Sequence, residues 1–194
     1  VNFIEQNYPD LLDHLSTAKS PMQMFGAVVK TYYAEKAGIN PADMVSVAIM
    51  PCTAKKAEAV RPEMNDSGYR DVDFVLTTRE LGRMIKEAGI DFEHLPSEDF
   101  DDPLGESTGA AVIFGASGGV MEAALRTVAD VLTGQALAKL EYQEVRGLEG
   151  IKEASIPIGD LNVKVAAVNS LSKARIVMEK IRAGEANYHF IEIR

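Results

Sequence analysis

The chain has 194 residues, of which 46% are hydrophobic and 25% charged, a composition that indicates a globular protein of one large domain or two small lobes. A net charge of −9, from 20 basic and 29 acidic residues, argues against binding to nucleic acid, which needs clustered Lys and Arg. A single cysteine excludes a disulfide framework and indicates a reducing, cytoplasmic compartment. No apolar run approaches the roughly 18 residues of a membrane span and no signal-like segment opens the chain, so we expect neither membrane insertion nor export.

The first predicted elements are a long helix and an apolar strand. Ser20 as N-cap, Pro21 at the first helical position and Gly38 at the end predict a helix over 20–38. The apolar stripe of this helix, expected to face the core, consists of Phe25, Val28, Val29 and Tyr32. The run 44–50 is β-branched and almost wholly apolar, which predicts a strand covered on both faces.

The next elements repeat this strand-and-helix alternation. The run 71–78 is typical of a second covered strand, and it leads into a helix over 79–89 with Gly89 as the C-cap. The apolar face of that helix consists of Leu81, Met84, Ile85 and Ala88. A further helix is predicted over 118–134, with an apolar face formed by Met121, Ala124, Leu125, Val128 and Leu132.

The last third of the chain predicts more strands and one more helix. Strands are expected at 142–147, 152–158, 161–170 and 187–193, and the first two of these are candidates for a hairpin. A helix over 171–184 has an inward face of Leu171, Ala174, Val177, Met178 and Ile181. We therefore expect a layered α/β fold with a largely parallel sheet flanked by helices, as a single fragment 1–194 with two lobes of about 1–112 and 113–194.

Cys52 is the first candidate site residue, because it follows a predicted strand and precedes Lys55 and Lys56. Ligands of open α/β sheets gather beyond the carboxyl ends of strands, and a nearby cation favours the thiolate that acts as nucleophile or metal ligand. The alternative is a buried structural cysteine beside two solvated lysines.

Two other segments have both a functional and a structural interpretation. Residues 113–126 open with a glycine-rich turn. In the functional interpretation, its glycines let the backbone approach an anion or cluster at a helix N-terminus. In the structural interpretation, they simply allow a strand and a helix to pack closely. The stretch from Glu87 to Leu125 is acidic. It lacks the residue spacing of a calcium-binding loop, so the interpretation as a solvated loop is favoured. The histidines show no metal-ligand spacing, and no residue is singled out as the base of a Cys–His hydrolase.

The stretches MPCTAKKAEA and GESTGAAVIFGASGGVMEAALRT closely resemble the catalytic, cluster-binding domain of [FeFe]-hydrogenases, the iron-only hydrogenase large subunit. Further matching stretches occur in the same order along essentially the whole chain. In that family a cubane [4Fe–4S] cluster is joined through a cysteine to a di-iron unit that carries CO, cyanide and a bridging dithiolate. The resemblance implies that Cys52 is one of four cubane ligands, that Lys55 donates a hydrogen bond to a cyanide, and that Glu58 supports Lys55.

The resemblance also assigns roles to residues outside this motif. It implies that Met50 and Phe114 pack against the di-iron unit, that Pro51 belongs to its wall, and that Ser16 lies on a proton-transfer route. The family's other cysteine elements would lie before Val1 and after the stretch FIEI, so three of four cubane ligands and the proton-donating cysteine are absent from this chain.

The sequence therefore predicts a fragment of an iron hydrogenase that reduces protons reversibly to hydrogen, and the fragment alone is expected to be inactive and to bind no cluster. The expected partners are the rest of the hydrogenase chain and ferredoxin or an NAD(P)-linked electron-transfer subunit. The alternatives are a non-enzymatic hydrogenase-like module for binding or assembly, and a thiol enzyme that uses Cys52 as nucleophile.

Overall fold

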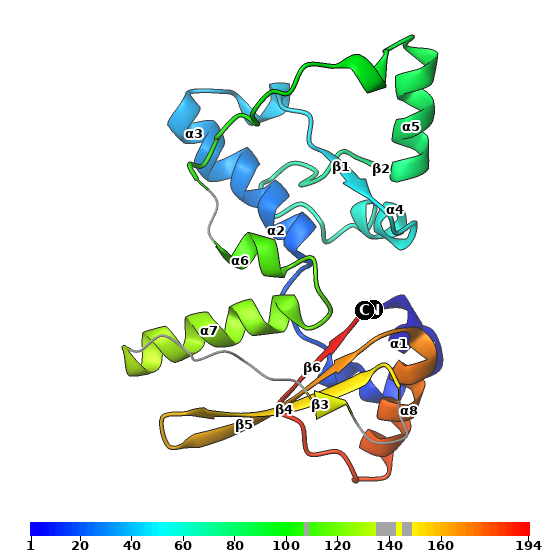
Figure 1. Ribbon diagram of the computed structural model, residues 1–194, viewed down its shortest axis with the longest axis vertical. Helices are drawn as coiled ribbons and strands as arrows, with labels where there is room; N and C mark the ends of the chain where they lie inside the picture. The colour runs from blue at the N-terminus through cyan, green and yellow to red at the C-terminus, as the bar shows by residue number, and fades with distance from the viewer. Residues whose placement is uncertain (107–108, 135–142, 145–148) are drawn as a thin grey trace. The chain divides into compact units, whose positions relative to one another are not determined.

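The computed structural model describes residues 1–106, 109–134, 143–144 and 149–194. These residues fall into two units, which we name unit 1 (Val1–Leu15 with Glu106–Arg194) and unit 2 (Ser16–Gly105). Figure 1 labels the helices and strands of both units. Among the described residues, no helix combines the length and the apolar character needed to cross a membrane.

Unit 2 is built around a pair of parallel strands with helices beside it. Its elements are α2 (Pro21–Val28), the π-helix η2 (Val29–Tyr33), α3 (Ala34–Ala37), the 3₁₀-helix η3 (Pro41–Asp43), β1 (Val47–Met50), α4 (Ala54–Ala59), β2 (Phe74–Thr77), α5 (Thr78–Glu87) and the 3₁₀-helix η4 (Phe92–His94). As predicted, Ser20 caps the helical run that starts at Pro21, and Gly38 ends it in a left-handed conformation. The run therefore has the predicted limits, although its middle turn is a π-helix.

The two strands of unit 2 are covered on one face. β1 and β2 pair in parallel, with Val47 opposite Phe74. One face packs on a small core of Ala59, Val72 and Val75, which is joined by Met22, Ala48 and Met50. The other face leaves Val47 48%, Ile49 49% and Phe74 61% exposed. The prediction of strands covered on both faces is therefore wrong for this pair, since these three side chains are about half exposed.

The helical run from Pro21 to Ala37 buries a different face from the predicted one. Its buried residues are Gln23, Gly26, Lys30 and Ala34. The predicted inward residues Phe25, Val28 and Tyr32 are 56%, 42% and 55% exposed, so that prediction is wrong. The backbone at Gly26 approaches the loop before β2 so closely that a Cβ atom would lie 2.4 Å from the carbonyl oxygen of Asp71. The buried face thus consists of two small residues, Gly26 and Ala34, and two polar ones, Gln23 and Lys30, so apolar character does not decide which face of this run is buried.

Lys30 completes that buried face with an ion pair. Its side chain is 2% exposed, and its Nζ donates to Asp73 Oδ2 at 2.6 Å and to the carbonyl oxygen of Arg70 at 2.7 Å. The same Asp73 oxygen accepts from the amide of Ser46 at 2.7 Å. Burial by itself would raise the pKa of Asp73, but the hydrogen bonds from Lys30 and Ser46 outweigh burial and lower it. The pair thereby ties the helix to the start of β1.

Unit 1 is a four-stranded sheet with helices on both faces. Its elements are α1 (Asn2–Asn7), the 3₁₀-helix η1 (Pro9–His14), α6 (Gly109–Ile113), α7 (Gly119–Thr133), β3 (Gln143–Glu144), β4 (Ile151–Ile158), β5 (Leu161–Val168), α8 (Leu171–Arg182) and β6 (Phe190–Ile193). The strand order is β3-β4-β5-β6. Strands β3 and β5 run antiparallel to β4, whereas β6 is parallel to β5. The α/β class with parallel pairing and flanking helices is confirmed. This sheet is mixed, however, because the two-residue turn between β4 and β5 makes these two strands antiparallel.

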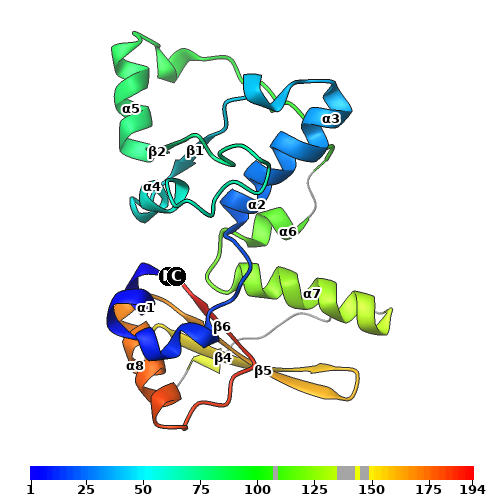
Figure 2. The same cartoon turned by 180° about the vertical axis from the view of Figure 1, so that it is seen from behind.

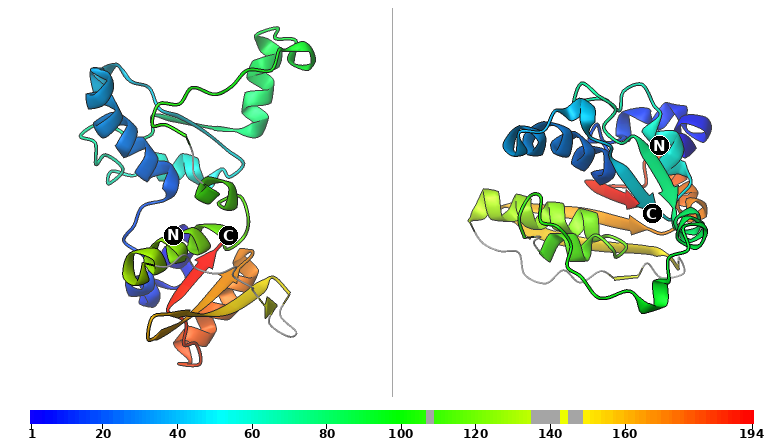
Figure 3. Two further views of the ribbon diagram at one scale, coloured as in Figure 1. Left: turned by 60° about the vertical axis from the view of Figure 1, so that its left-hand side comes forward. Right: turned by 90° about the horizontal axis from the view of Figure 1, so that it is seen from above.

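The two faces of this sheet have separate cores. On β5, Val165 and Ala167 contribute to the core beneath α7, whereas Ala166 and Val168 contribute to the core beneath α8. Figures 2 and 3 show α7 and α8 on opposite faces of the sheet. The alternation of side chains along a strand explains how one short apolar run serves both cores.

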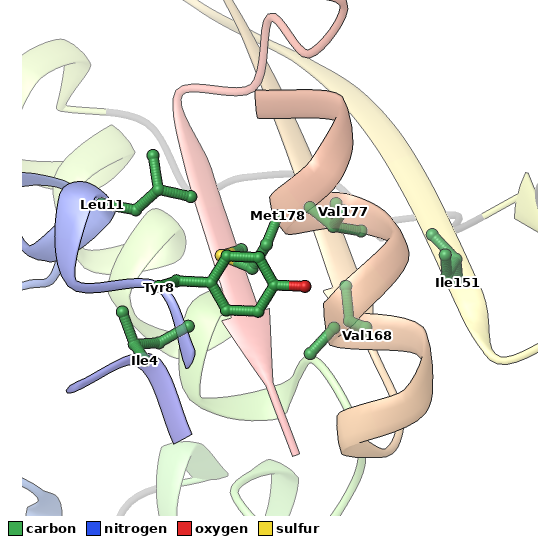
Figure 4. Close-up of a cluster of buried hydrophobic side chains, with 9 residues drawn as sticks. Ile4, Tyr8, Leu11, Ile151, Val168, Val177 and Met178 are labelled. Carbon is green, nitrogen blue, oxygen red and sulfur yellow. The ribbon is translucent and has the colours of Figure 1, made fainter. Parts of the chain in front are cut away.

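The N-terminal residues belong to the core beneath α8. Ile4, Tyr8 and Leu11 lie against Val177 and Met178 of α8 (Figure 4). The buried Tyr8 donates from its hydroxyl to Glu179 Oε1 at 2.9 Å, and Arg182 pairs with Asp10 at 2.5 Å. Residues 1–15 therefore pack with the C-terminal half of the chain, and the unit boundaries do not coincide with a division near residue 112.

The inward faces of α7 and α8 are predicted in part. On α7, Met121 and Leu125 are buried as expected, Ala129 joins them in the core against the sheet, and Ala123 is buried as well. The expected inward residues Ala124, Val128 and Leu132 are exposed, so that part of the prediction is wrong. On α8 the predicted Ala174, Val177 and Met178 are buried and Ile181 packs beside them, but Leu171 is 54% exposed. Of the strand expected at 142–147, only residues 143–144 are described.

Candidate functional site

Cys52 lies in the short turn between β1 and α4. β1 ends at Met50, and α4 begins at Ala54, so Pro51, Cys52 and Thr53 form the connection at the carboxyl end of the strand. The backbone amide of Lys55 donates to the carbonyl oxygen of Cys52 at 3.3 Å, which closes the turn. The thiol-bearing residue is exposed. The interpretation of Cys52 as a buried structural cysteine is therefore wrong.

The two lysines after Cys52 each have a carboxylate partner. Lys55 Nζ lies 2.7 Å from Glu58 Oε2, and these side chains are 21% and 22% exposed. Lys56 Nζ lies 2.7 Å from Glu80 Oε2, in a pair about two-fifths exposed. Hydrogen bonds from Lys56 and from Thr77 lower the pKa of Glu80 to about 2. Lys55 is thus the more shielded of the two cations, and it stands one helical turn after the cysteine.

Glu58 also contacts a residue from the start of α2. Its Oε1 atom accepts a hydrogen bond from the hydroxyl of Ser20, so its two oxygens bind one ammonium and one hydroxyl. Glu58 lies beside Lys55, as the sequence motif predicts, whereas the sequence indicates Ser20 only as a helix cap. No local pattern reveals the second contact, since 38 residues separate Ser20 from Glu58.

The other predicted residues of unit 2 differ in exposure. Met50 is half-buried against the core of Ala59, Val72 and Val75, whereas Pro51 is exposed. Ser16 is exposed, and its Oγ accepts from the amide of Ala18 at 3.1 Å. The structure therefore brings Met50, Pro51, Cys52, Lys55 and Glu58 together around one strand–turn–helix segment, while Ser16 lies in the segment before α2.

The glycine-rich turn of unit 1 is closed by a carboxylate of the chain itself. The amides of Gly118 and Met121, at the start of α7, donate to Glu192 Oε1 at 3.1 Å and Oε2 at 2.8 Å. An anion at this helix N-terminus was one sequence interpretation, and the structure supplies the anion from β6. The turn follows the helix α6 instead of the strand expected there, and a Cβ atom on Gly119 would lie 1.7 Å from the carbonyl oxygen of Ile113.

Phe114, the predicted site residue of unit 1, lies in this turn and is half-buried. The guanidinium group of Arg194 donates to the carbonyl oxygens of Phe114 at 2.6 Å and Ala116 at 2.5 Å. Together with Glu192, Arg194 fixes the backbone of the turn to the end of β6. Sequence reasoning missed both residues, although polar side chains two positions apart on an otherwise apolar strand indicate one shared face.

The remaining candidate segments provide no metal-binding cluster in the described part of the chain. Residues 91–106 are exposed, and His94 Nδ1 lies 2.8 Å from Asp91 Oδ2. Within the described ranges, no group of three or more His, Cys, Asp or Glu residues is placed to hold a metal ion. The donor chemistry around Cys52 nevertheless fits one thiolate ligand to iron and one ammonium donor to an anionic ligand.

Gln23 is an unusual polar residue in the same unit. Its side chain is fully buried, and within the described part of the chain neither its Oε1 nor its Nε2 atom has a hydrogen-bond partner. Buried amides without partners are rare in native proteins and each one calls for an explanation.

Comparisons with known proteins find relatives that match nearly the whole chain. The chain is 51% identical over 193 residues to the NADP-reducing hydrogenase subunit HndD of Solidesulfovibrio fructosivorans, covering 100% of this chain and 33% of that protein. It is 51% identical over 190 residues to the periplasmic [Fe] hydrogenase large subunit of Nitratidesulfovibrio vulgaris, covering 98% of this chain and 45% of the relative. The chain thus spans a third to under a half of the length of these relatives.

A solved structure and a more distant relative extend the comparison. An [FeFe]-hydrogenase structure described as revealing stepwise H-cluster assembly has a TM-score of 0.80 and 41% identity, covering 98% of this chain and 55% of that one. The mouse cytosolic iron-sulfur assembly component 3 is 30% identical over 188 residues, which cover 94% of this chain and 40% of that protein. The family described as iron only hydrogenase large subunit, C-terminal domain, matches residues 1–194. The chain belongs to this iron-only hydrogenase family.

Proposed function

We propose that this chain is part of an [FeFe]-hydrogenase that catalyses the reversible conversion of two protons and two electrons into hydrogen. The observation that carries the proposal is the exposed Cys52 at the carboxyl end of β1, with the shielded Lys55 ammonium on the following helical turn. Family membership along the whole chain supports it. The active cofactor would be a [4Fe–4S] cluster joined to a di-iron unit with CO and cyanide ligands, and it supplies the redox chemistry when bound.

Cys52 and Lys55 have distinct roles in this proposal. The Cys52 thiolate would be one of the four cysteine ligands that such a cubane takes. Lys55 would donate a hydrogen bond to an anionic diatomic ligand, for which a compact ammonium is well suited. Glu58 would hold the Lys55 ammonium in place through their 2.7 Å contact.

The other predicted residues would form the surroundings of the cofactor. Met50 and Phe114 would pack against the di-iron unit, Pro51 would contribute to its wall, and Ser16 would pass protons along a route to it. The carbonyl contacts of Arg194 support a fixed backbone at Phe114, which such packing requires.

We propose that the 194 residues alone are inactive, because they contain one cysteine whereas a cubane takes four thiolates. Anaerobic reconstitution of the isolated chain with iron and sulfide should leave no stoichiometric cluster absorption. Four tightly bound irons per monomer would contradict this part of the proposal.

The electron partner is proposed to be ferredoxin or an NAD(P)-linked subunit of a larger hydrogenase. The Solidesulfovibrio relative, which is named an NADP-reducing hydrogenase subunit, supports the second possibility. A cytoplasmic location agrees with the single cysteine, but another relative is periplasmic. Cell fractionation and hydrogen-dependent reduction of ferredoxin or NAD(P) by the complete protein test these assignments.

A second candidate function is a non-enzymatic role in iron-sulfur assembly. The 30% identity to an assembly component favours this candidate, whereas the relatives at 51% identity are hydrogenases. Hydrogen turnover by the complete, matured protein distinguishes the two: its absence, with a bound cubane present, would support the assembly role.

The site itself is tested by three substitutions in the complete protein. Lys55→Met keeps most of the side-chain volume but leaves an anionic ligand without its donor, at a cost of about 1–3 kcal/mol. We expect shifted cyanide infrared bands or loss of the di-iron unit, with the cubane signal in electron paramagnetic resonance retained. Cys52→Ala should instead damage the cubane. The matched control is Lys56→Met, which removes the neighbouring cation paired with Glu80 and should leave both signals unchanged.

A further inference from the structure

Ser20 joins the start of α2 to the ion pair beside Cys52. Its hydroxyl donates to Glu58 Oε1, while Glu58 Oε2 accepts from the Lys55 ammonium at 2.7 Å. All of these groups lie in unit 2, and the Lys55 and Glu58 side chains are about one-fifth exposed. The carboxylate therefore has a charged donor on one oxygen and a neutral donor from a different element on the other.

An ion pair between residues three apart on one helix does not by itself fix an ammonium group. Such pairs form on exposed helices, contribute little to stability and exchange among several rotamers. A second contact to Glu58 from outside the helix restricts this freedom, because Glu58 can then satisfy both oxygens in only a narrow range of rotamers. The side chain that supplies this contact is Ser20.

The separation between Ser20 and Glu58 is held by a shared core. Ala59, next to Glu58 in sequence, is buried with Val72 and Val75. Met22, in the first turn of α2 after Ser20, packs against the same cluster. The first turn of α2 and the last turn of α4 are thus anchored to one set of buried side chains, which keeps the hydroxyl within reach of the carboxylate.

We infer that Ser20 and Glu58 are positioning residues that fix the Lys55 ammonium beside the Cys52 turn. The inference rests on the proposed function for the use of Lys55, but the position of the ammonium is a separate, measurable quantity. Ser20 also caps α2 by accepting from the Gln23 amide at 3.5 Å, so the test must separate capping from positioning.

The direct test is the location of Lys55 Nζ in crystal structures of the complete apoprotein. In Ser20→Ala and Glu58→Gln we expect the Lys55–Glu58 contact to lengthen or break and the ammonium to move, whereas Ser20→Thr, which keeps a hydroxyl, should restore it. Asn40→Ala is the control, because it removes the side chain that caps η3 through a 3.2 Å bond to the Ala42 amide. An ammonium that stays in place in Ser20→Ala would overturn the inference.

Infrared spectra of the matured protein show whether this position is used. Ser20→Ala and Glu58→Gln should shift the cyanide bands in the same direction as Lys55→Met and by a smaller amount, with Ser20→Thr and Asn40→Ala close to the unaltered protein. If the ammonium moves in the crystals but Lys55→Met leaves the bands unshifted, positioning stands and the proposed role of Lys55 fails. If Lys55→Met shifts the bands but Ser20→Ala and Glu58→Gln leave them unshifted, positioning by Ser20 and Glu58 is overturned.

Discussion

Replacing Gly26 with alanine adds one methyl group at the closest approach between α2 and the loop before β2. The new Cβ atom would lie 2.4 Å from the Asp71 carbonyl oxygen, 2.8 Å from its carbon and 3.0 Å from Val72 Cγ2. Real Cβ atoms do not approach backbone within 3.0 Å, so α2 or this loop must retreat by more than half an ångström. The change therefore separates two elements that share a core.

The expected cost follows from one stabilising and two destabilising contributions. Alanine in place of glycine inside a helix stabilises it by about 1 kcal/mol. Overpacking of a tight site costs about 1–3 kcal/mol. The retreat also strains Asp71, whose buried carboxylate accepts from the amides of Asp66 and Ser67 at 3.0 Å each, and each such bond contributes about 1 kcal/mol. We expect a net loss of about 2 kcal/mol in the free energy of unfolding.

Gly82→Ala in α5 is the matched control for this prediction. Apart from the adjacent residues and the backbone of its own helix, no described atom lies within 4 Å of the Cβ that it adds, so the helix gain should appear alone as a stabilisation of about 0.5–1 kcal/mol. Urea unfolding of both variants, followed by circular dichroism, measures the difference. Equal stabilisation by the two substitutions would refute the close approach at Gly26.

Three further predictions concern unit 2. Lys30→Met leaves Asp73 without its cation and should destabilise the protein by about 3 kcal/mol. This is the lower end of the cost of breaking a buried ion pair, because Asp73 is partly exposed. Lys36→Met, on the exposed side of the same helical run, is the control and should change the free energy of unfolding in urea by no more than about 0.5 kcal/mol. The pKa of Glu80 is lowered to about 2 from an ordinary 4.5, so its contribution to stability is complete above pH 4.5 and is lost as the pH falls through 2. Glu80→Gln should therefore flatten the pH dependence of the melting temperature between these values. An unchanged slope would contradict the prediction. Gln23→Met removes a buried amide without a partner and should stabilise by about 1–3 kcal/mol in thermal unfolding, whereas destabilisation would show that the amide is satisfied in solution.

Local patterns predicted the elements well and the buried faces less well. The cap at Ser20, the stop at Gly38 and the strands before and after residue 160 depend on neighbouring residues, which the sequence shows directly. The face that a helix buries depends on a distant surface. For α2 this surface is the backbone at Asp71, which selects Gly26 rather than the exposed Phe25.

The candidate site shows the same division. Cys52, Lys55 and Glu58 lie within seven consecutive positions, so their association could be predicted from the motif. The hydroxyl partner of Glu58 is 38 residues away, and the carboxylate at the start of α7 is 74 residues from Gly118. Contacts of this kind arise only when the cores of the units bring the elements together.

The packing of the N-terminal segment has a consequence for the order of folding. Tyr8 and its hydrogen-bond partner Glu179 are separated by 171 positions, whereas unit 2 is one continuous stretch. On the ribosome, unit 2 can form as soon as its last residues emerge, but Ile4, Tyr8 and Leu11 must wait for α8 to be translated. Until then these apolar side chains lack their packing partners on α8, and chaperones that hold nascent chains should act on them. Proteolysis of stalled nascent chains should show protection of residues 16–105 well before that of residues 1–15; simultaneous protection would contradict this order.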